Sequence, residues 1–222
     1  MENGHEIFQH DIFQYLPEGI AETLPTVRVN KDTVFIPAEA QEVIDLYYIL
    51  DGEVSVFAQS HNGREFLIDT LPSGNFIGKF SQMRNQNFYC EVRANCECRL
   101  LVLTRYKEFL LSDKSFALYF YIKTTDRVYE MYKLSMARTL YSYDELFAYW
   151  LLKLADDKRV VACEDELIRL KMNISERQFF YLLKKLGGLK LIRRARNKIQ
   201  LLDEDGLRDL AQNVCSFMDS SY

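Results

Sequence analysis

Positive charge is concentrated between Leu167 and Gln200, where the side chains could neutralise a row of phosphates. This segment carries ten basic residues and one acidic residue, Glu176, for a net charge of +9, whereas the whole 222-residue chain carries −4. Such a cluster in an acidic protein predicts binding of a polyanion. A solvated basic face without a partner has the same charge pattern. The basic residues are Arg169, Lys171, Arg177, Lys184, Lys185, Lys190, Arg193, Arg194, Arg196 and Lys198.

A turn predicted at Asn173 favours DNA as that polyanion. Ser175 and Gln178 have the spacing of a capping box, in which two side chains satisfy two main-chain N–H groups at the start of a helix. Ile174 and Phe179 stand where a hydrophobic staple fixes the entry of the chain into that helix. Asparagine tolerates the left-handed backbone of a tight turn. The pattern therefore predicts a helix-turn-helix whose second helix lies in a DNA major groove.

The elements around this turn follow from the spacing of apolar residues. We expect helices over residues 165–172 and 175–186, and the glycine pair 187–188 ends the second of them. Residues 193–198 form the basic tip of a short hairpin beside these helices, which we interpret as a wing. The residues of the second helix that should face the core are Phe179, Leu182, Leu183 and Leu186.

Residues 27–104 have the pattern of several short β-strands. The dipeptides at 51–52 and 62–63 contain glycine after Asp or Asn and predict turns, and the pattern is interrupted again near residues 94–95. Short strands at regular spacing are typical of a barrel or a sandwich. The strand-like segments are 46–50, 53–56, 65–71 and 88–103.

Three more helices are predicted. Residues 115–140 contain no Gly or Pro and would form a rod about 39 Å long, residues 145–154 with Trp150 form a core helix, and residues 203–218 follow the cap Asp203. The apolar seam of the rod has the spacing of a helix that packs along a partner helix, which favours a dimer spine over packing on its own domain. The seam consists of Leu118, Ile122, Thr125, Tyr129, Tyr132, Met136 and Thr139.

Composition limits the class of protein. Hydrophobic content of 48% is ordinary for a globular protein, and no apolar run approaches the roughly 20 residues of a membrane span. Residues 1–10 are polar and contain no apolar signal core, so a cytoplasmic protein is expected. Residues 1–141 carry a net charge of −5 and residues 142–222 a net charge of +1. DNA would repel the acidic residues 1–141, and this repulsion would help to orient the basic residues toward the DNA.

Four local motifs, in this order of elements, carry a resemblance to a known family. They are Leu46–Val54 (LYYILDGEV), Gly74–Gly78 (GNFIG), Val92–Ala94 (VRA) and Ile174–Arg177 (ISER). Together with the long helix and the wing they resemble the Crp/Fnr family of bacterial transcription regulators. Within it the chain is most similar to the YeiL-like regulators, through Phe66–Asp69 (FLID) and the aromatic second helix of the turn.

The resemblance implies an α+β fold in three parts. These are a jelly-roll-like β-barrel sensor domain over residues 1–112, a dimerisation helix over 113–141 and a winged helix-turn-helix DNA-binding domain over 142–222. It implies a homodimer that binds double-stranded promoter DNA and works with RNA polymerase, with an unidentified small-molecule effector as a further possible partner. No cofactor, metal or membrane partner is expected.

The resemblance also assigns roles at the DNA. Glu176, Arg177 and Tyr181 match positions that reach base edges, since glutamate can accept from cytosine and arginine can fork to guanine. A cyclic-AMP regulator has arginine where this chain has Tyr181, so the operator should differ. The residues expected at phosphates are Ser175, Gln178, Arg193, Arg194, Arg196 and Lys198.

The predicted effector pocket consists of Gly78, Lys79, Phe88 and Tyr89. Family members that bind cyclic AMP have a glutamate at the position of Lys79 and an Arg-Ser pair at the position of Phe88 and Tyr89. Aromatic rings offer no fork for phosphate oxygens, so we expect that cyclic AMP is not held in the usual way. The cations that could attract another anion, or simply be surface charges, are Lys79, Arg84 and Arg93.

Redox and haem sensing have weaker support in the sequence. The oxygen-sensing branch of the family uses N-terminal cysteines for an iron–sulfur centre, but the first cysteine here is Cys90. Cys96 and Cys98 would share one face of a regular strand, as a thiol sensor, a metal pair or two buried small side chains. The histidines, which show no pattern of an axial haem ligand, are His5, His10 and His61.

Two other function classes compete with DNA binding. A ligand-binding signalling module whose helical end contacts a protein would show no steep salt dependence with duplex. An enzyme is the third class, but the chain has no metal-ligand spacing, phosphate loop or nucleophile motif. We therefore predict a non-enzyme.

Overall fold

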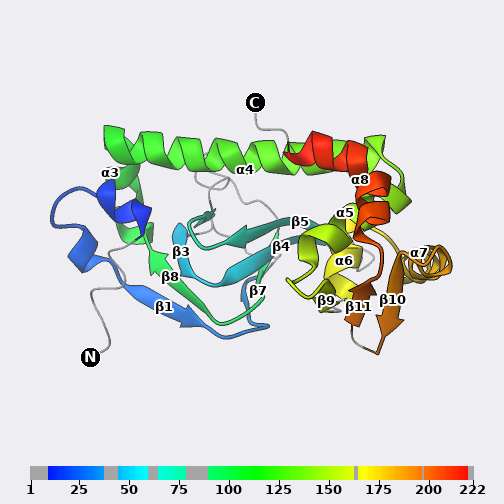
Figure 1. The fold of residues 1–222 in the computed structure, drawn as a ribbon. Helices are drawn as coiled ribbons and strands as arrows, with labels where there is room; N and C mark the ends of the chain where they lie inside the picture. Colours follow the sequence, from blue (N-terminus) through cyan, green and yellow to red (C-terminus); the bar gives the residue numbers. More distant parts are fainter. Residues whose placement is uncertain are drawn as a thin grey trace. The chain divides into compact units, whose positions relative to one another are not determined.

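A computed structural model gives the fold of the chain (Figure 1). It describes residues 10–37, 45–59, 65–78, 90–162, 165–196 and 198–219. The chain divides into two compact units, Met1–Tyr129 and Glu130–Tyr222, and the division falls inside the long helix α4 (Lys114–Leu140). The expected domain boundaries, which follow the two ends of this helix, remain a prediction.

The strands of the first unit form two four-stranded antiparallel sheets, with strand orders β1-β8-β3-β6 and β2-β7-β4-β5. Apart from the consecutive pair β4 and β5, neighbouring strands in the two sheets are distant in the sequence, as in a jelly roll. The strands are β1 (Thr26–Val29), β2 (Val34–Ile36), β3 (Tyr47–Asp51), β4 (Glu53–Gln59), β5 (Glu65–Pro72), β6 (Phe76–Ile77), β7 (Glu91–Ala94) and β8 (Cys98–Val102).

The expected closed barrel is wrong for the part of the chain that the structure describes. Its strands pair within two separate open sheets, and no described pairing joins one sheet to the other. The physical reason is that short strands alternate between the sheets, so the two inner apolar faces meet face to face as in a sandwich. Strand alternation in a sequence predicts the buried faces, but it does not predict closure.

The predicted turn at residues 51–52 is confirmed, and its glycine is required there. Gly52 has φ = +92°, and a Cβ atom on it would lie 2.6 Å from Sγ of Cys98 and 2.7 Å from the carbonyl oxygen of Glu97. The predicted interruption near residues 94–95 is confirmed as well, because β7 ends at Ala94. The expected turn at 62–63 lies outside the described residues.

One core cluster of the first unit combines leucines with aromatic residues and lies beside the short helices η1 (Asp11–Gln14), η2 (Ala21–Thr23), η3 (Thr104–Tyr106) and α3 (Lys107–Ser112). The ring of Phe76 meets those of Tyr48 and Phe120 edge to face, with centroids 5.2 and 4.9 Å apart. The carboxylate of Asp11 accepts from the hydroxyls of Tyr48 at 2.5 Å and Tyr119 at 2.8 Å. These contacts fix the N-terminal segment and the first turns of α4 to the sheet that contains β3.

The predicted rod is confirmed as a single 27-residue helix, α4 (Figure 1). Four large hydrophobic residues of its seam are exposed, namely Leu118 at 57%, Ile122 at 48%, Tyr129 at 44% and Tyr132 at 61%. Thr124, on another face, is buried. An exposed apolar stripe on one face of a long helix indicates a surface that packs against a partner.

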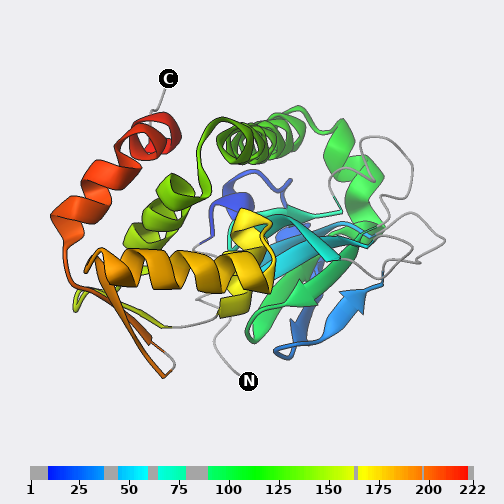
Figure 2. The ribbon, with the colours of Figure 1, turned by 90° about the vertical axis from the view of Figure 1, so that its right-hand side faces the viewer.

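The second unit combines helices with a small three-stranded antiparallel sheet of order β10-β11-β9. Figure 2 shows the strands β10 and β11 as a hairpin that follows helix α7. The elements are α5 (Tyr143–Leu154), β9 (Val160–Ala162), α6 (Asp165–Met172), α7 (Glu176–Gly188), β10 (Ile192–Ala195), β11 (Lys198–Leu201) and α8 (Glu204–Asp219).

The predicted inward faces of this unit are confirmed. Phe179, Leu182, Leu183 and Leu186 of α7 are all buried in one cluster, and Phe179 meets Phe147 of α5 edge to face with ring centroids 5.6 Å apart. The last helix begins as expected, because the carboxylate of Asp203 accepts from the N–H of Gly206 at 2.9 Å. Leu207 and Val214 of α8 are buried in the same cluster, Leu210 is partly buried against it, and so is Trp150 of α5.

Candidate functional site

The turn between α6 and α7 has the geometry that the sequence predicts. Asn173 adopts the left-handed conformation with φ = +54°. Its N–H donates to the carbonyl of Leu170 at 3.1 Å, and the N–H of Ile174 donates to that of Arg169 at 3.0 Å. These two bonds form a Schellman motif, which ends α6 sharply and satisfies its last carbonyls. Only three residues therefore separate the end of α6 from the start of α7.

The start of α7 is closed by the predicted capping box. The hydroxyl of Ser175 accepts from the N–H of Gln178 at 3.3 Å, and the side-chain carbonyl of Gln178 accepts from the N–H of Ser175 at 3.0 Å. Ile174 and Phe179, the predicted staple, are both buried in the core cluster. The helix is thus fixed at its first turn, and its N-terminus points an array of N–H groups outward, where an anion is favoured.

The predicted base-reading residues lie together on the exposed face of α7. Glu176, Arg177 and Tyr181 are all exposed, and Tyr181 is exposed to 63%. Arg177 and Tyr181 are four residues apart and hence neighbours on the helix surface. Among the residues that the structure describes, Arg177 forms no hydrogen bond or ion pair. Phe180, which the sequence-based set omitted, is also exposed on α7, to 43%.

Arg169 lies at the contact between α6 and α7. One terminal nitrogen of its guanidinium is 4.0 Å from the carboxylate of Glu176, while its Nε is buried with no hydrogen-bond partner in the described part of the chain. Arg169 is accommodated because its side chain reaches the rim of the helix pair, where it meets the one acidic residue of the basic segment.

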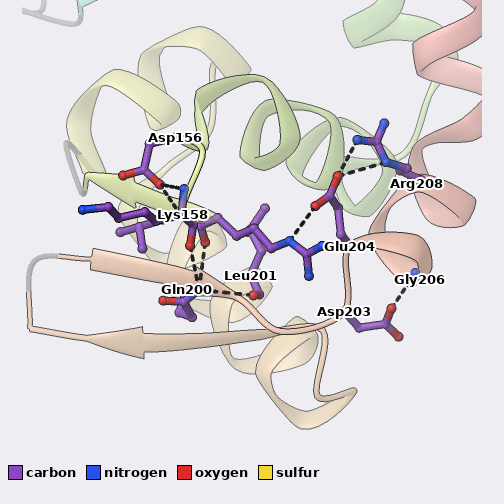
Figure 3. A network of polar contacts seen from close by, with 10 residues as sticks. Asp156, Lys158, Gln200, Leu201, Asp203, Glu204, Gly206 and Arg208 are labelled. Atoms are coloured by element: carbon purple, nitrogen blue, oxygen red, sulfur yellow. Dashed lines mark hydrogen bonds and ion pairs between the residues drawn. The ribbon is translucent and has the colours of Figure 1, made fainter.

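The hairpin β10–β11 is anchored by its apolar residues and by a network at its base (Figure 3). Ile192, Ile199 and Leu201 are buried. The amide of Gln200 donates to the carbonyls of Lys158 at 3.3 Å and Leu201 at 3.4 Å (Figure 3). The tip of the hairpin carries the predicted phosphate contacts Arg193, Arg196 and Lys198, which are all exposed.

Arg194, the fourth cation of the hairpin, is held within the unit. Its Nη2 lies 2.6 Å from the carboxylate of Asp165 in the first turn of α6, and its guanidinium carbon lies 4.9 Å from the ring centroid of Phe180. Sequence reasoning missed Asp165 and Phe180. No local spacing relates them to Arg194, which is 29 residues after Asp165.

Helix α7 ends at the predicted glycine pair, two residues later than the predicted Leu186, but neither glycine is the left-handed residue that follows it. The helix runs through Gly188, and the left-handed residue that closes it is Lys190, with φ = +59°. The N–H of Leu191 donates to the carbonyl of Leu186 at 3.1 Å, and that of Lys190 donates to Gly187 at 3.0 Å, which is a second Schellman motif. The packing of Leu186 in the core and the start of β10 place the left-handed residue at Lys190, two residues after Gly188.

Only one of the predicted effector-pocket residues belongs to the described part of the chain. Gly78 follows β6 with φ = +85°, whereas Lys79, Phe88 and Tyr89 lie outside the described residues, as does Arg84. Arg93 is described, and its guanidinium binds the carboxylates of Glu91 at 2.5 Å and Glu65 at 3.0 Å. Arg93 is therefore neutralised on its own sheet, which contradicts the alternative that it attracts an anionic effector.

The two neighbouring cysteines are placed differently from each other. Cys98 is buried in β8, and its thiol donates to the carbonyl of Glu53 at 3.3 Å. Burial raises the pKa of Cys98 and raises that of Cys90 to about 12, so both thiols stay protonated at neutral pH. Cys96 precedes the strand and is exposed, so the expectation of one shared strand face is wrong. Among the described residues no group of three or more His, Cys, Asp or Glu could hold a metal ion.

Comparison with known proteins agrees with this architecture. Residues 27–110 match the family model of the cyclic nucleotide-binding domain. A solved structure from Eubacterium rectale, assigned to the Crp/Fnr family of transcriptional regulators, has 19% sequence identity and a TM-score of 0.77, over 91% of this chain and 98% of that one. This chain has the fold of the Crp/Fnr regulators. No curated protein sequence matches it.

Other structures with the Crp/Fnr fold are similar as well. A CRP/FNR-family regulator from Thermus thermophilus has 19% identity and a TM-score of 0.69 over 85% of this chain and 98% of its own. The regulator CLP of Xanthomonas campestris, which responds to cyclic di-GMP, has 16% identity and a TM-score of 0.70 over 82% of this chain and 95% of its own. None of the helices in the described ranges is both long and apolar enough to cross a bilayer.

Proposed function

We propose that the chain is a transcription regulator of the Crp/Fnr type. It binds double-stranded DNA through α6, α7 and the hairpin β10–β11, which act as a winged helix-turn-helix. One observation carries the proposal: the capped turn at Asn173 and the capping box at Ser175 hold α7 so that Arg177 and Tyr181 are exposed beside a cationic hairpin. A helix presented in this way fits a major groove.

The exposed face of α7 reads base edges. Arg177 donates to the O6 and N7 atoms of a guanine, Glu176 accepts from the amino group of a cytosine, and Tyr181 lies against a neighbouring base. Ser175 and Gln178 contact a phosphate at the N-terminus of the helix. Arg193, Arg196 and Lys198 neutralise phosphates of the flanking backbone. Arg194, the remaining member of the predicted phosphate set, is already paired within the protein.

Two copies of the chain associate along α4. The exposed seam residues of this helix would cover one another in a homodimer, as a and d residues do in paired helices. Two recognition helices then meet successive major-groove segments about 34 Å apart, so the operator is a palindrome with that spacing. The proposal therefore links the open face of α4 to the symmetry of the DNA site.

The first unit senses a small molecule and acts through α4. Its match to the cyclic nucleotide-binding domain supports this role. By the resemblance, the effector would contact Gly78, Lys79, Phe88 and Tyr89, and it is not cyclic AMP bound in the usual way, because the chain lacks the family's glutamate and Arg-Ser pair. The protein acts in the cytoplasm with RNA polymerase, and its sequence resembles the YeiL-like regulators.

A selection experiment tests the function. Purified full-length protein is mixed with fragmented genomic DNA, alone and with cyclic AMP, cyclic GMP or cyclic di-GMP, and the bound fragments are sequenced. We expect a shared palindrome, and affinity that falls by a factor of about 10³ or more between roughly 50 and 200 mM salt, since a dimer neutralises several phosphates. Absence of binding at low salt under every condition overturns the proposal. Capture of a protein with no salt-dependent DNA binding favours the signalling-module alternative.

A further inference from the structure

Among the described cations of the hairpin, only Arg194 forms an ion pair within the protein. Its Nη2 is 2.6 Å from Oδ2 of Asp165, and its guanidinium stacks on Phe180 at 4.9 Å. The side chain is exposed to only 33%. Three elements meet at this guanidinium, because Asp165 belongs to α6, Phe180 to α7 and Arg194 to β10.

The register of the hairpin explains why Arg194 differs from its neighbours. Successive residues of a strand point to opposite faces, so Arg194 shares a face with Ile192, while Arg193 points the other way. Ile192 is buried, and so is Ile199, the residue paired with Arg194 across the hairpin. Arg194 therefore continues the inner face of the hairpin, whereas Arg193, Arg196 and Lys198 form no ion pair with any residue that the structure describes.

Moving Arg194 to a DNA phosphate would be unfavourable. Asp165 would lose its ion pair with Arg194 while the phosphate, a second anion, came near. The first turn of α6 still favours an acidic residue, but this does not replace the ion pair. Phe180 would lose its cation–π contact with the guanidinium. A cation already shared between a carboxylate and a ring contributes little net charge to a DNA interface.

We propose that Arg194 is a positioning residue that clasps the hairpin to α6 and α7, and that it does not bind DNA. The clasp sets the distance between the base-reading face of α7 and the phosphate-binding cations Arg193, Arg196 and Lys198. This inference rests on the proposed DNA-binding function. It changes the role of Arg194 from a phosphate contact to an internal support.

Asp165→Asn separates the two roles, because it leaves every cation in place. The measurements use the selected operator and the full-length protein. We expect affinity to fall by about tenfold. The slope of log affinity against log salt should become shallower by about one to three, because the released hairpin cations no longer contact phosphates. Arg194→Met should do the same. Arg193→Ala, the matched control on the other face of the strand, should lower the slope by only about one.

A direct phosphate contact by Arg194 gives the opposite result. Asp165→Asn would then free the guanidinium, so binding would become tighter and the slope steeper, which overturns the proposal. Asp165→Glu, which keeps the ion pair, should bind like the wild type. The charge swap Asp165→Arg with Arg194→Asp restores the pair, so binding should recover relative to Arg194→Asp alone; failure to recover also counts against the clasp.

Hydrogen exchange of the free protein tests the clasp without DNA. In Asp165→Asn the N–H groups of β10 and β11 should exchange at least about tenfold faster, while those in the middle of α7 keep their protection, which also shows that the variant is folded. Unchanged exchange of the hairpin overturns the clasp. Should the wild type bind no DNA, the proposed function fails, and this measurement still decides what Arg194 holds.

Discussion

The guanidinium of Arg138, two residues before the end of α4, donates to the carbonyl oxygen of Lys171 at 2.6 Å and to that of Leu170 at 3.3 Å. Both carbonyls lie in the last turn of α6, where the Schellman bonds from Asn173 and Ile174 end the helix. A cation at a helix C-terminus is favourable because the last carbonyls carry partial negative charge. The end of α4 is thereby fixed to α6, the helix that precedes α7.

Arg138→Met should destabilise the second unit. Hydrogen bonds to a charged group contribute about 1.5–3 kcal/mol each, and the substitution also leaves half-buried carbonyls without that donor. We expect a loss of about 2–4 kcal/mol in the free energy of unfolding, measured by urea titration. Arg138→Lys is the control, since it keeps the charge and one donor and should lose less. Equal midpoints for wild type and Arg138→Met would show that the contact adds no stability.

Arg177→Ala should lower affinity for the selected operator by about 1–3 kcal/mol and relax the preference for one base. The reason is that Arg177 is exposed on α7 and forms no bond with described residues that would compete with a guanine. The measurement is fluorescence anisotropy with the operator and with a scrambled duplex of the same length. An equal loss on both duplexes would mean that the arginine only holds the backbone.

The carboxylate of Asp11 makes the stability of the first unit depend on pH. Burial alone raises the pKa of Asp11, but hydrogen bonds from Lys123, Tyr48 and Tyr119 outweigh it and lower the pKa below its ordinary value. Because the pKa is lower in the folded state, this stabilisation is present above the unfolded pKa of about 3.9 and is lost as the pH falls through the folded value.

Asp11→Asn should therefore unfold at lower urea than the wild type at pH 6, and the difference should shrink as the pH is lowered from about 4 towards 2. The neutral amide keeps the size of the side chain but binds Lys123 less strongly. Asp45→Asn offers a matched control, because within the described part of the chain Asp45 accepts only a long contact of 3.4 Å from the hydroxyl of Tyr47. A difference that stays constant across this pH range would exclude the titration of Asp11 as its cause.

Features fixed by adjacent residues could be predicted from the sequence. Asn173, Ser175 and Gln178 act within six residues of one another, so their spacing gave both the turn and the cap. The contacts that hold this site in place are non-local: Arg138 and Lys171 are 33 residues apart, and Arg194 and Asp165 are 29 apart. No periodicity relates such pairs, because only the packing of the elements brings them together.

The end of α7 shows how packing overrides a local preference. Glycine is favoured at a left-handed helix end, but the apolar contacts of Leu186 and the register of β10 place the left-handed residue at Lys190. A residue with a Cβ atom costs roughly 1–2 kcal/mol in this conformation. The glycine pair therefore marks the end of the helix as predicted, but it does not supply the left-handed residue.

Lys190→Gly should stabilise the protein. Relief of the left-handed strain exceeds the extra entropy that glycine loses on folding, so a gain of about 0.5–1 kcal/mol in unfolding free energy is expected. Lys190→Ala keeps the strain and removes the same charge, and it should not be more stable than the wild type. A stabilisation shared by both variants would point to charge repulsion within the basic segment as the cause.

Tyr132→Glu should separate the two copies of the proposed homodimer. The ring is 61% exposed in the single chain and lies on the seam of α4, so a carboxylate there would be buried against its own symmetry mate. A loss of about 2 kcal/mol for each copy corresponds to a roughly thousandfold rise in the dimer dissociation constant. Sedimentation equilibrium measures this constant.

Phe109→Glu is the control, because Phe109 is 54% exposed on α3 and does not belong to the seam. If Phe109→Glu dissociates the dimer and Tyr132→Glu does not, the two copies associate through a different surface, and the operator spacing derived from α4 no longer follows.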